Sequence, residues 1–259
     1  MAAIVAVAGG AQAASITNVV TMNGAGSEPG VGQIYSALTG ISLANNAVNQ
    51  VGAGSGSVGI GTNTIAGRVS DDLDGVWFDG TIDVGFAALY WGNANQAQGS
   101  ANHSFGVTQD NGAVSTLFNA GPSHATTLGD VFTGLGPFPT TSELRFVAQN
   151  AASGVTANSD ADNNAGRDRM ITFDITGLET LNVSAFGGID IDLTALPALG
   201  EGKGTFLLFF ETGSDNDFQD LVVLAHNVGF GRNVPIIPLP SAAGLGFLGL
   251  AGLAARRRR

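Results

Sequence analysis

Short segments that alternate apolar and polar residues recur along the chain, each bounded by glycine and other turn-forming residues. This period of two predicts strands that bury one face. In residues 81–91, the apolar side chains that share one face are Ile82, Val84, Phe86 and Ala88. Residues 142–148 and 169–175 alternate in the same way, and residues 180–186 are a candidate partner for 169–175.

Two apolar runs, residues 206–211 and 221–228, are almost continuous, as is typical of buried strands, and we expect them to form a hairpin. No segment of comparable length shows a clear period of 3.6. Residues 15–64, rich in Gly, Asn, Ser and Val, predict irregular strands or a partly mobile region. We therefore expect an all-β domain over residues 14–233, an antiparallel β-sandwich or jelly roll.

The composition agrees with one sizeable folded domain. The chain has 259 residues, of which 44% are apolar, only 12% are charged and 39 are glycine. There is no cysteine, which excludes disulfides, thiol catalysis and cysteine-based zinc sites, and three histidines leave little for a His-rich metal centre.

The charge is strongly acidic and unevenly distributed. The net charge is −11, but four of the ten basic residues stand at the C-terminus, so the rest of the chain carries six basic and twenty-one acidic residues. Such a body repels nucleic acid, which we exclude as a partner. It suits divalent cations, or simply a soluble surface.

The first residues are typical of the second half of a secretory signal peptide. An apolar run over residues 2–10 precedes Ala11-Gln12-Ala13, an A-x-A pattern that predicts cleavage before Ala14. Residues 1–13 are then a partial signal peptide read by the Sec export machinery. The usual basic region is missing, so we expect the native start further upstream. The alternative is a buried apolar strand.

The C-terminal residues 234–259 combine three features: a proline motif, an uncharged apolar stretch from Leu239 to Ala255, and a basic cluster. The stretch has 17 residues, at the short end for a bilayer-spanning helix. The basic cluster would hold that end in the cytoplasm. Its residues are Arg256, Arg257, Arg258 and Arg259.

This order resembles the PEP-CTERM class of bacterial sorting signals, and in particular the variant whose motif reads Val-Pro-Leu-Pro-Ala. The motif residues are Pro238, Leu239, Pro240, Ser241 and Ala242. The chain departs from the variant at Ile237, where valine is usual, and at Ser241, which precedes the alanine. The resemblance implies recognition by an exosortase-type membrane protease, removal of the tail, and delivery to the cell surface or an extracellular polysaccharide matrix.

The two apolar runs are joined by an acidic segment whose candidate metal ligands are Glu211, Asp215, Asp217 and Asp220. Calcium takes six to eight oxygen ligands, and carboxylates at these spacings can curl around one ion. The spacing is not that of an EF-hand. The alternative is a hairpin whose Asp and Asn side chains cap turns by accepting hydrogen bonds from nearby backbone amides.

The same segment resembles a motif of secreted bacterial β-domains, approximately Phe-Glu-Asp, a Gly-rich turn, Asp-x-Asp-Phe/Tyr-Asn-Asp and Leu-Val-Val. Thr212 and Gln219 depart from this motif. The matching residues are Asp215, Asp217, Phe218, Asp220, Leu221, Val222 and Val223. The resemblance implies that the hairpin binds calcium or pins the fold.

Two further clusters are acidic. One comprises residues 71–74 with Asp79 and Asp83, within a segment (68–77) that also resembles part of these tail-bearing proteins. The other is a polar loop that could hold calcium or simply be solvated. Its residues are Asp160, Asp162, Asn163, Asn164 and Asp168.

Signals of catalysis are weak. Asp190 and Asp192 would lie about 7 Å apart on one strand face, a separation that suits glycoside hydrolysis, but an outward polar face explains them equally. There is no G-x-S-x-G and no phosphate-binding loop. Trp77, Tyr90 and Trp91 could stack on sugars or pack in the core.

We therefore expect a non-enzymatic protein of the cell surface or extracellular matrix, with calcium as the candidate cofactor. The alternatives are a carbohydrate-binding module for exopolysaccharide and a secreted glycoside-active enzyme. Exposed aromatic residues along a groove would favour the module, and paired carboxylates with shifted pKa values in a pocket would favour the enzyme.

Overall fold

A computed structural model describes residues 29–43, 67–69, 74–78, 84–92, 102–109, 111–121, 127–130, 132–133, 143–213 and 217–230. The predicted signal peptide (1–13) and sorting signal (234–259) lie outside these ranges, as do Asp215 and the acidic residues 71, 72, 79 and 83. Among the described residues, no helix is both long enough and apolar enough to cross a membrane.

The described residues are mostly antiparallel strands, which confirms the all-β prediction. Ten strands form one sheet: β1 (Trp77–Phe78), β2 (Gly85–Trp91), β3 (His103–Gln109), β4 (Ser115–Ala120), β5 (Phe132–Thr133), β6 (Leu144–Asn150), β7 (Thr156–Asn158), β8 (Met170–Asp174), β11 (Gly204–Phe210) and β12 (Leu221–Phe230). A separate pair is β9 (Thr180–Leu181) with β10 (Ile191–Asp192). The helical segments are α1 (Val31–Thr39) and the 3-10 turns η2 (Ala161–Asn164), η3 (Val183–Phe186) and η4 (Leu193–Ala195).

The ten strands fall into two halves that share β12. In what we call the β11 half, the start of β12 pairs with β11 and β2, and the outer strands are β8 and β5. In the β3 half, the end of β12 pairs with β1, followed by β6, β3 and β4, with β7 on β6. The pairing of β12 with β11 skips Asn227, which has φ +62°. Such a bulge bends a strand and lets it pass from one sheet layer to the next.

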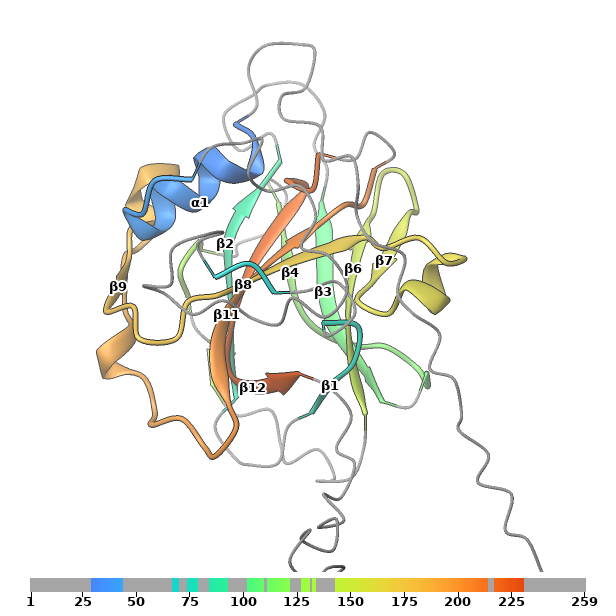
Figure 1. Ribbon diagram of the computed structural model, residues 1–259. Helices are drawn as coiled ribbons and strands as arrows, with labels where there is room; N and C mark the ends of the chain where they lie inside the picture. The colour runs from blue at the N-terminus through green and yellow to red at the C-terminus, as the bar shows by residue number, and fades with distance from the viewer. Residues whose placement is uncertain are drawn as a thin grey trace, which may run out of the picture.

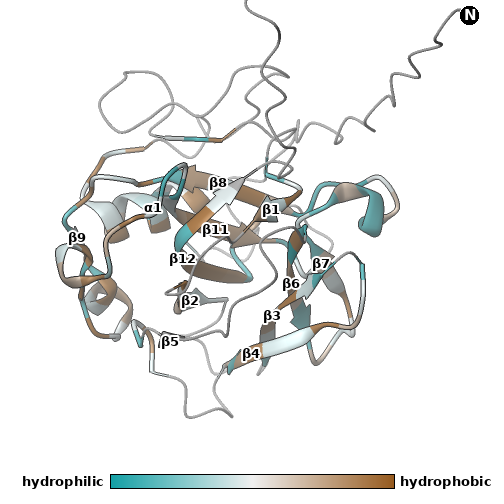
Figure 2. Cartoon of the chain, turned by 90° about the horizontal axis from the view of Figure 1, so that it is seen from below, coloured by the Kyte–Doolittle hydropathy of each residue, from teal (hydrophilic) through white to brown (hydrophobic). Residues whose placement is uncertain are grey.

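The two halves face each other through aromatic side chains. Phe86 on β2 contacts Phe105 on β3, with ring centroids 5.4 Å apart, and Phe210 on β11 lies 5.9 Å from the same ring. At the other end of β11, Phe206 packs against Trp77 of β1. The main core therefore lies between the halves, as the layers in Figure 2 show.

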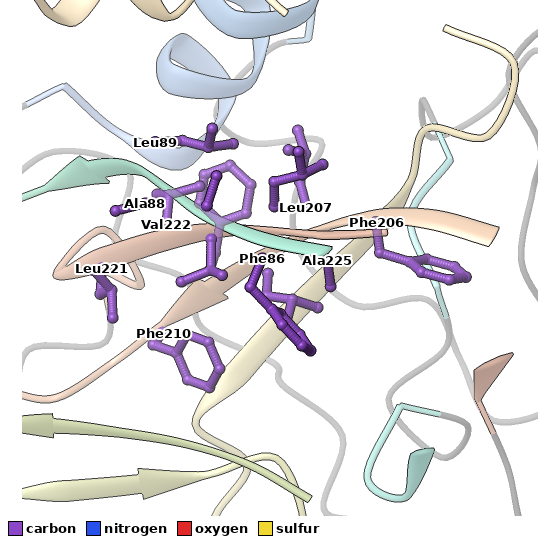
Figure 3. Close-up of a cluster of buried hydrophobic side chains, with 14 of the residues drawn as sticks. Phe86, Ala88, Leu89, Phe206, Leu207, Phe210, Leu221, Val222 and Ala225 are labelled. Carbon is purple, nitrogen blue, oxygen red and sulfur yellow. The ribbon is translucent and has the colours of Figure 1, made fainter. Parts of the chain in front are cut away.

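A second apolar layer covers the outer face of the β11 half. Tyr35 of α1 packs against Phe173 of β8, with ring centroids 4.7 Å apart, and Phe173 contacts Phe209 of β11. Figures 1 and 2 show α1 and β9 on this side of the sheet. Because both faces are covered, all seven residues of β11 are buried. In Figure 3, Leu207 lies on the α1 side and Phe210 on the opposite side.

Several predicted elements are present. The hairpin of the two apolar runs is confirmed, since β11 and β12 pair along their length from Phe210 with Leu221. Residues 142–148 correspond to β6, residues 169–175 to β8, and the strand expected over 81–91 is described as β2 from Gly85.

Two predictions are wrong. Residues 180–186 are not the partner of 169–175: β8 pairs with β11, while the other segment divides into β9 and η3. The region 15–64 also contains a helix, α1. Its buried apolar residues follow helical spacing, since each turn places another side chain on the sheet-facing side: Val31, Ile34, Tyr35 and Leu38.

Candidate functional site

The candidate site is the connection between β11 and β12, residues 211–220, which we call the acidic turn. Carboxylate oxygens of Glu211, Asp217 and Asp220 all lie within 4.8 Å of one another. Glu211 is completely buried, Asp217 is 3% exposed and Asp220 is half-buried. The structure thus brings together three of the four predicted ligands, and Asp215 lies outside the described residues.

The Glu211 carboxylate organises the backbone of the turn. Its Oε2 accepts hydrogen bonds from the backbone N–H groups of Asp217 (2.9 Å) and Phe218 (3.4 Å). Phe218 is buried with φ +55°, a left-handed conformation that is unfavourable for a bulky side chain. The two converging amides explain why the chain holds this conformation, and they fix the following residues against Glu211.

The two aspartates also accept local hydrogen bonds. Asp220 Oδ2 accepts the Thr212 N–H at 2.6 Å, and Asp217 Oδ2 accepts a hydrogen bond from Gln219 Nε2 at 2.7 Å. Turn capping, the alternative weighed from the sequence, is therefore present. It coexists with the convergence of the three carboxylates, because each carboxylate has two oxygens.

Arg169, just before β8, contacts this turn. Its Nη1 donates to the backbone oxygens of Glu211 (3.1 Å) and Gly213 (3.0 Å). Burial, together with the charge of Arg167, lowers the pKa of Arg169, while Glu211 and Asp220 oppose that shift. The guanidinium therefore supports the turn through its carbonyl groups and adds positive charge beside the carboxylates.

The acidic turn also touches the β3 half. Thr212 Oγ1 lies 3.4 Å from Nδ1 of His103, the first residue of β3, and the Thr212 carbonyl accepts a hydrogen bond from Ser153 Oγ at 3.4 Å. On the other side, Gly92 after β2 donates its N–H to the Asp220 carbonyl. One short connection thus joins segments from both halves of the sheet.

His103 is almost completely buried. Burial lowers its pKa to about 4, because the charged imidazolium is disfavoured away from water. At neutral pH the side chain is therefore uncharged and adds no positive charge to the site.

The carboxylates favour one kind of chemistry. Three carboxylates so close together, two of them buried, repel one another unless a cation or a proton neutralises them. Carboxylate oxygens are the preferred ligands of hard cations such as calcium. The geometry suits binding of a cation.

The second described acidic segment, residues 158–168, is here called the acidic loop. Asp160 forms an ion pair with Arg145 at 2.7 Å, and its Oδ1 accepts the Asp162 N–H. The Asn164 side chain accepts the Asn158 N–H and donates to the Asn158 carbonyl, and Asn158 Oδ1 accepts the Asp160 N–H. Asp168 Oδ1 accepts the Met170 N–H. These groups stabilise the loop and do not converge on one point.

Asp190 and Asp192 do not share a regular strand, because β10 contains only Ile191 and Asp192 and is followed by η4. Both are exposed, and each binds the protein locally: Asp190 accepts the Ser184 N–H and Asp192 accepts the Thr194 N–H. These bonds lower the pKa of both groups. A catalytic acid needs a raised pKa, so the pair lacks the property expected of a glycosidase acid.

Of the two alternatives for the aromatic residues Trp77, Tyr90 and Trp91, the structure shows core packing for the first two. Trp77 is fully buried against Phe146 and Phe206. Tyr90 is buried against Phe186, since the pairing of β2 with β12 skips Leu89 and turns the strand. Only Trp91 is half-buried, beside the acidic turn.

Arg169 and His103 are site residues that the sequence analysis did not identify. Arg169 could have been found from the sheet register: Met170 pairs with Phe210, so the preceding residue comes opposite Glu211. The order of strands β8 and β11 was needed first. No sequence signal marks His103.

Comparison with protein-family models finds no match for this chain, and none of the curated proteins compared with it matches either.

Proposed function

We propose that this chain is an exported, non-enzymatic protein of the cell surface or extracellular matrix, folded as a β-sandwich that calcium stabilises at the acidic turn. The resemblance of residues 234–259 to a PEP-CTERM signal supports sorting by an exosortase-type protease. The observation that carries the calcium proposal is the convergence of Glu211, Asp217 and Asp220 within 4.8 Å.

Because two of the three carboxylates are buried, this cluster differs from an acidic patch that water solvates. Glu211 and Asp217 are almost inaccessible to water, so their charges lose solvation when the protein folds. A divalent cation offsets that loss and the mutual repulsion in one step. Calcium outside the cell would therefore favour the folded state.

The position of the turn supports a structural role for the cation. The turn connects the two central strands and contacts His103 and Ser153 of the β3 half. A cation held here would tie both halves at one end of the molecule.

Arg169 is the alternative source of positive charge. Its described hydrogen bonds go to the backbone oxygens of the turn. The Arg169→Met variant separates the two sources: if calcium neutralises the site, the variant keeps its calcium response, although its stability in chelator falls.

A carbohydrate-binding module is the second candidate. Trp91 favours it, since this half-buried aromatic residue pairs with Leu221 directly beside the acidic turn. Stacking on a sugar would quench or shift its fluorescence when exopolysaccharide is added, an effect that Trp91→Ala should remove. A glycoside-active enzyme has no comparable support, because Asp190 and Asp192 are exposed caps.

Thermal unfolding of the full-length chain with calcium or with chelator tests the main proposal. A ligand that binds only the native state stabilises it by about 2.7 kcal/mol at one hundred times its Kd. We expect a clear rise in Tm with calcium that Asp217→Asn and Asp220→Asn abolish and that Asp160→Asn, in the acidic loop, retains. An unchanged Tm at millimolar calcium would exclude the metal site.

Sorting is tested separately in cells that carry or lack an exosortase. We expect the tail to be removed only when the protease is present, and replacement of Arg256 to Arg259 by alanine to reduce processing. Processing independent of the protease would contradict the sorting proposal without affecting the calcium result.

A further inference from the structure

The turn between β3 and β4 contains an Asn-Gly pair, Asn111-Gly112, at an exposed position. The Gly112 N–H donates to the Gln109 carbonyl at 2.7 Å, which closes a four-residue turn. Asn111 occupies the middle of this turn with φ +60°, a conformation that asparagine tolerates better than most residues.

One side-chain contact joins this turn to the acidic loop. Asn163 Nδ2 in η2 donates to Asn111 Oδ1 at 2.7 Å. The two residues are 52 positions apart and both are exposed. The contact therefore restrains the Asn111 side chain without burying it.

We propose that Asn111 is a site of spontaneous deamidation whose rate is controlled by the contact with Asn163. The Gly112 nitrogen, after losing its proton to water or hydroxide, attacks Cγ of Asn111. The new N–Cγ bond closes a five-membered imide as the side-chain amide leaves as ammonia. Water then opens the imide at either carbonyl to give aspartate or isoaspartate. The net change is asparagine plus water to an acid plus ammonia, with no redox step.

The native turn restrains both reacting groups. The Gly112 N–H is engaged with Gln109, and the Asn111 amide is held by Asn163. Reaction therefore requires a local opening of the turn. Since the groups are exposed, such opening needs no disruption of the core.

The two products differ in their effect. Aspartate keeps an oxygen that can accept from Asn163 and adds one negative charge. Isoaspartate adds a carbon to the backbone inside the four-residue turn. The longer backbone would break two hydrogen bonds of the turn. These are the bond from the Gly112 N–H to the Gln109 carbonyl and the bond from Thr108 Oγ1 to the Gly112 carbonyl (2.8 Å). This product would release the tip of the β3–β4 hairpin from the acidic loop.

Peptide mapping of the aged full-length chain tests the proposal. Cleavage before aspartate isolates residues 110–129 and residues 1–70, and the second peptide contains another Asn-Gly pair, Asn23-Gly24, as an internal reference. We expect deamidation at Asn111 to be slower in native buffer than in denaturant, where its rate should equal that at Asn23.

The variants make the control by Asn163 measurable. Asn163→Ala should speed deamidation at Asn111 several-fold and leave Asn23 unchanged, whereas the matched control Asp162→Ala, the exposed neighbour in η2, should change neither. Gly112→Ala should slow the reaction at Asn111, because a side chain at this position hinders imide closure. Equal rates at Asn111 in native buffer and in denaturant, no modification at Asn111 after Asn23 has reacted fully, or no response to Asn163→Ala would each overturn the proposal.

Discussion

The acidic turn and the acidic loop have similar side chains but use them differently. In the loop, Asp160 pairs with Arg145, and the side chains of Asn158 and Asn164 bond to the backbone of neighbouring loop residues. In the turn, three carboxylates lie within 4.8 Å of one another, and two of them are buried. The loop is attached at the side of β6, whereas the turn lies between the central strands.

The difference shows that acidic composition alone does not bring carboxylates together. What distinguishes the turn is the closure of a buried hairpin, which forces Glu211 inward directly after β11. The loop has no such constraint, and Asp162 and Asn163 remain at the surface. Substitutions in the turn should therefore have larger effects than equivalent substitutions in the loop.

The largest expected effect is that of Glu211→Ala. It leaves the backbone N–H groups of Asp217 and Phe218 without their acceptor in a buried turn, a loss of about 4 kcal/mol in the free energy of unfolding. Urea denaturation measures it. Asp162→Ala, an exposed change in the loop, should stay within about 0.5 kcal/mol of wild type. Equal effects of the two variants would remove the contrast between the regions.

Glu211→Gln separates hydrogen bonding from charge at the same position. Glutamine keeps an oxygen acceptor but no charge, so in chelator it should be less destabilising than alanine. Its Tm should no longer rise with calcium. A variant that still responds fully would show that the Glu211 charge takes no part in cation binding.

The next effect is acid sensitivity at His103, which contacts the turn through Thr212. Its pKa is lowered to about 4 in the folded protein, against about 6.5 when unfolded. Between these values the unfolded chain binds the extra proton, so stability falls as pH falls from about 6.5 to about 4, by about 3 kcal/mol at most. Above pH 6.5 the group contributes no pH dependence.

Urea denaturation of wild type and His103→Gln between pH 4 and 7 measures this contribution, since the carboxylates titrate in both proteins and cancel in the difference. The variant should show a shallower loss of stability in acid. Parallel curves for the two proteins would mean that the acid sensitivity comes from elsewhere.

The sequence predicted the strands of the β11 half better than their neighbours. Alternation and apolar runs identified β8, β11 and β12, because these strands bury long stretches of side chains. The pairing of β8 with β11 was not predicted, since alternation gives the buried face of a strand and not its partner. The four helically spaced residues of α1 were present in the sequence, but the helix is short and lies among glycines.

For the site, the sequence predicted that acidic side chains of the turn come together, but not that Glu211 and Asp217 are buried there. The spacing of Asp217 and Asp220 after an apolar run indicated oxygen ligands, and the structure brings both to Glu211. Burial of the end of β11 depends on both neighbouring layers, since Phe209 packs on Phe173 and Phe210 on Phe105, contacts that the sequence does not show. The burial of Trp77 and Tyr90 was equally unpredictable, because the sequence does not distinguish an aromatic residue in a core from one on a surface.

Asp160→Ala should have an intermediate effect. It removes the 2.7 Å partner of Arg145, whose side chain is only 6% exposed, and leaves Glu143 at 3.1 Å as the remaining carboxylate. A hydrogen bond to a charged group contributes about 2 kcal/mol, so we expect a loss of that size in urea denaturation. The calcium-induced rise in Tm should be unchanged. If Asp160→Ala abolished that rise, the cation would belong to the loop and not to the turn.

The smallest effect should come from Asp192, which caps η4 at the surface. Bonds from the Thr194 side chain and backbone lower its pKa, so its contribution to stability is present at neutral pH and is lost as pH falls through that lowered value. Asp192→Ala should lower the Tm slightly at pH 7, and the difference from wild type should disappear in strong acid. Asp192→Asn keeps an acceptor oxygen, so its Tm at pH 7 should lie between those of Asp192→Ala and wild type. A fall in Tm as large as that of Glu211→Ala would show that the exposure of an acidic side chain does not determine how much its substitution destabilises this protein.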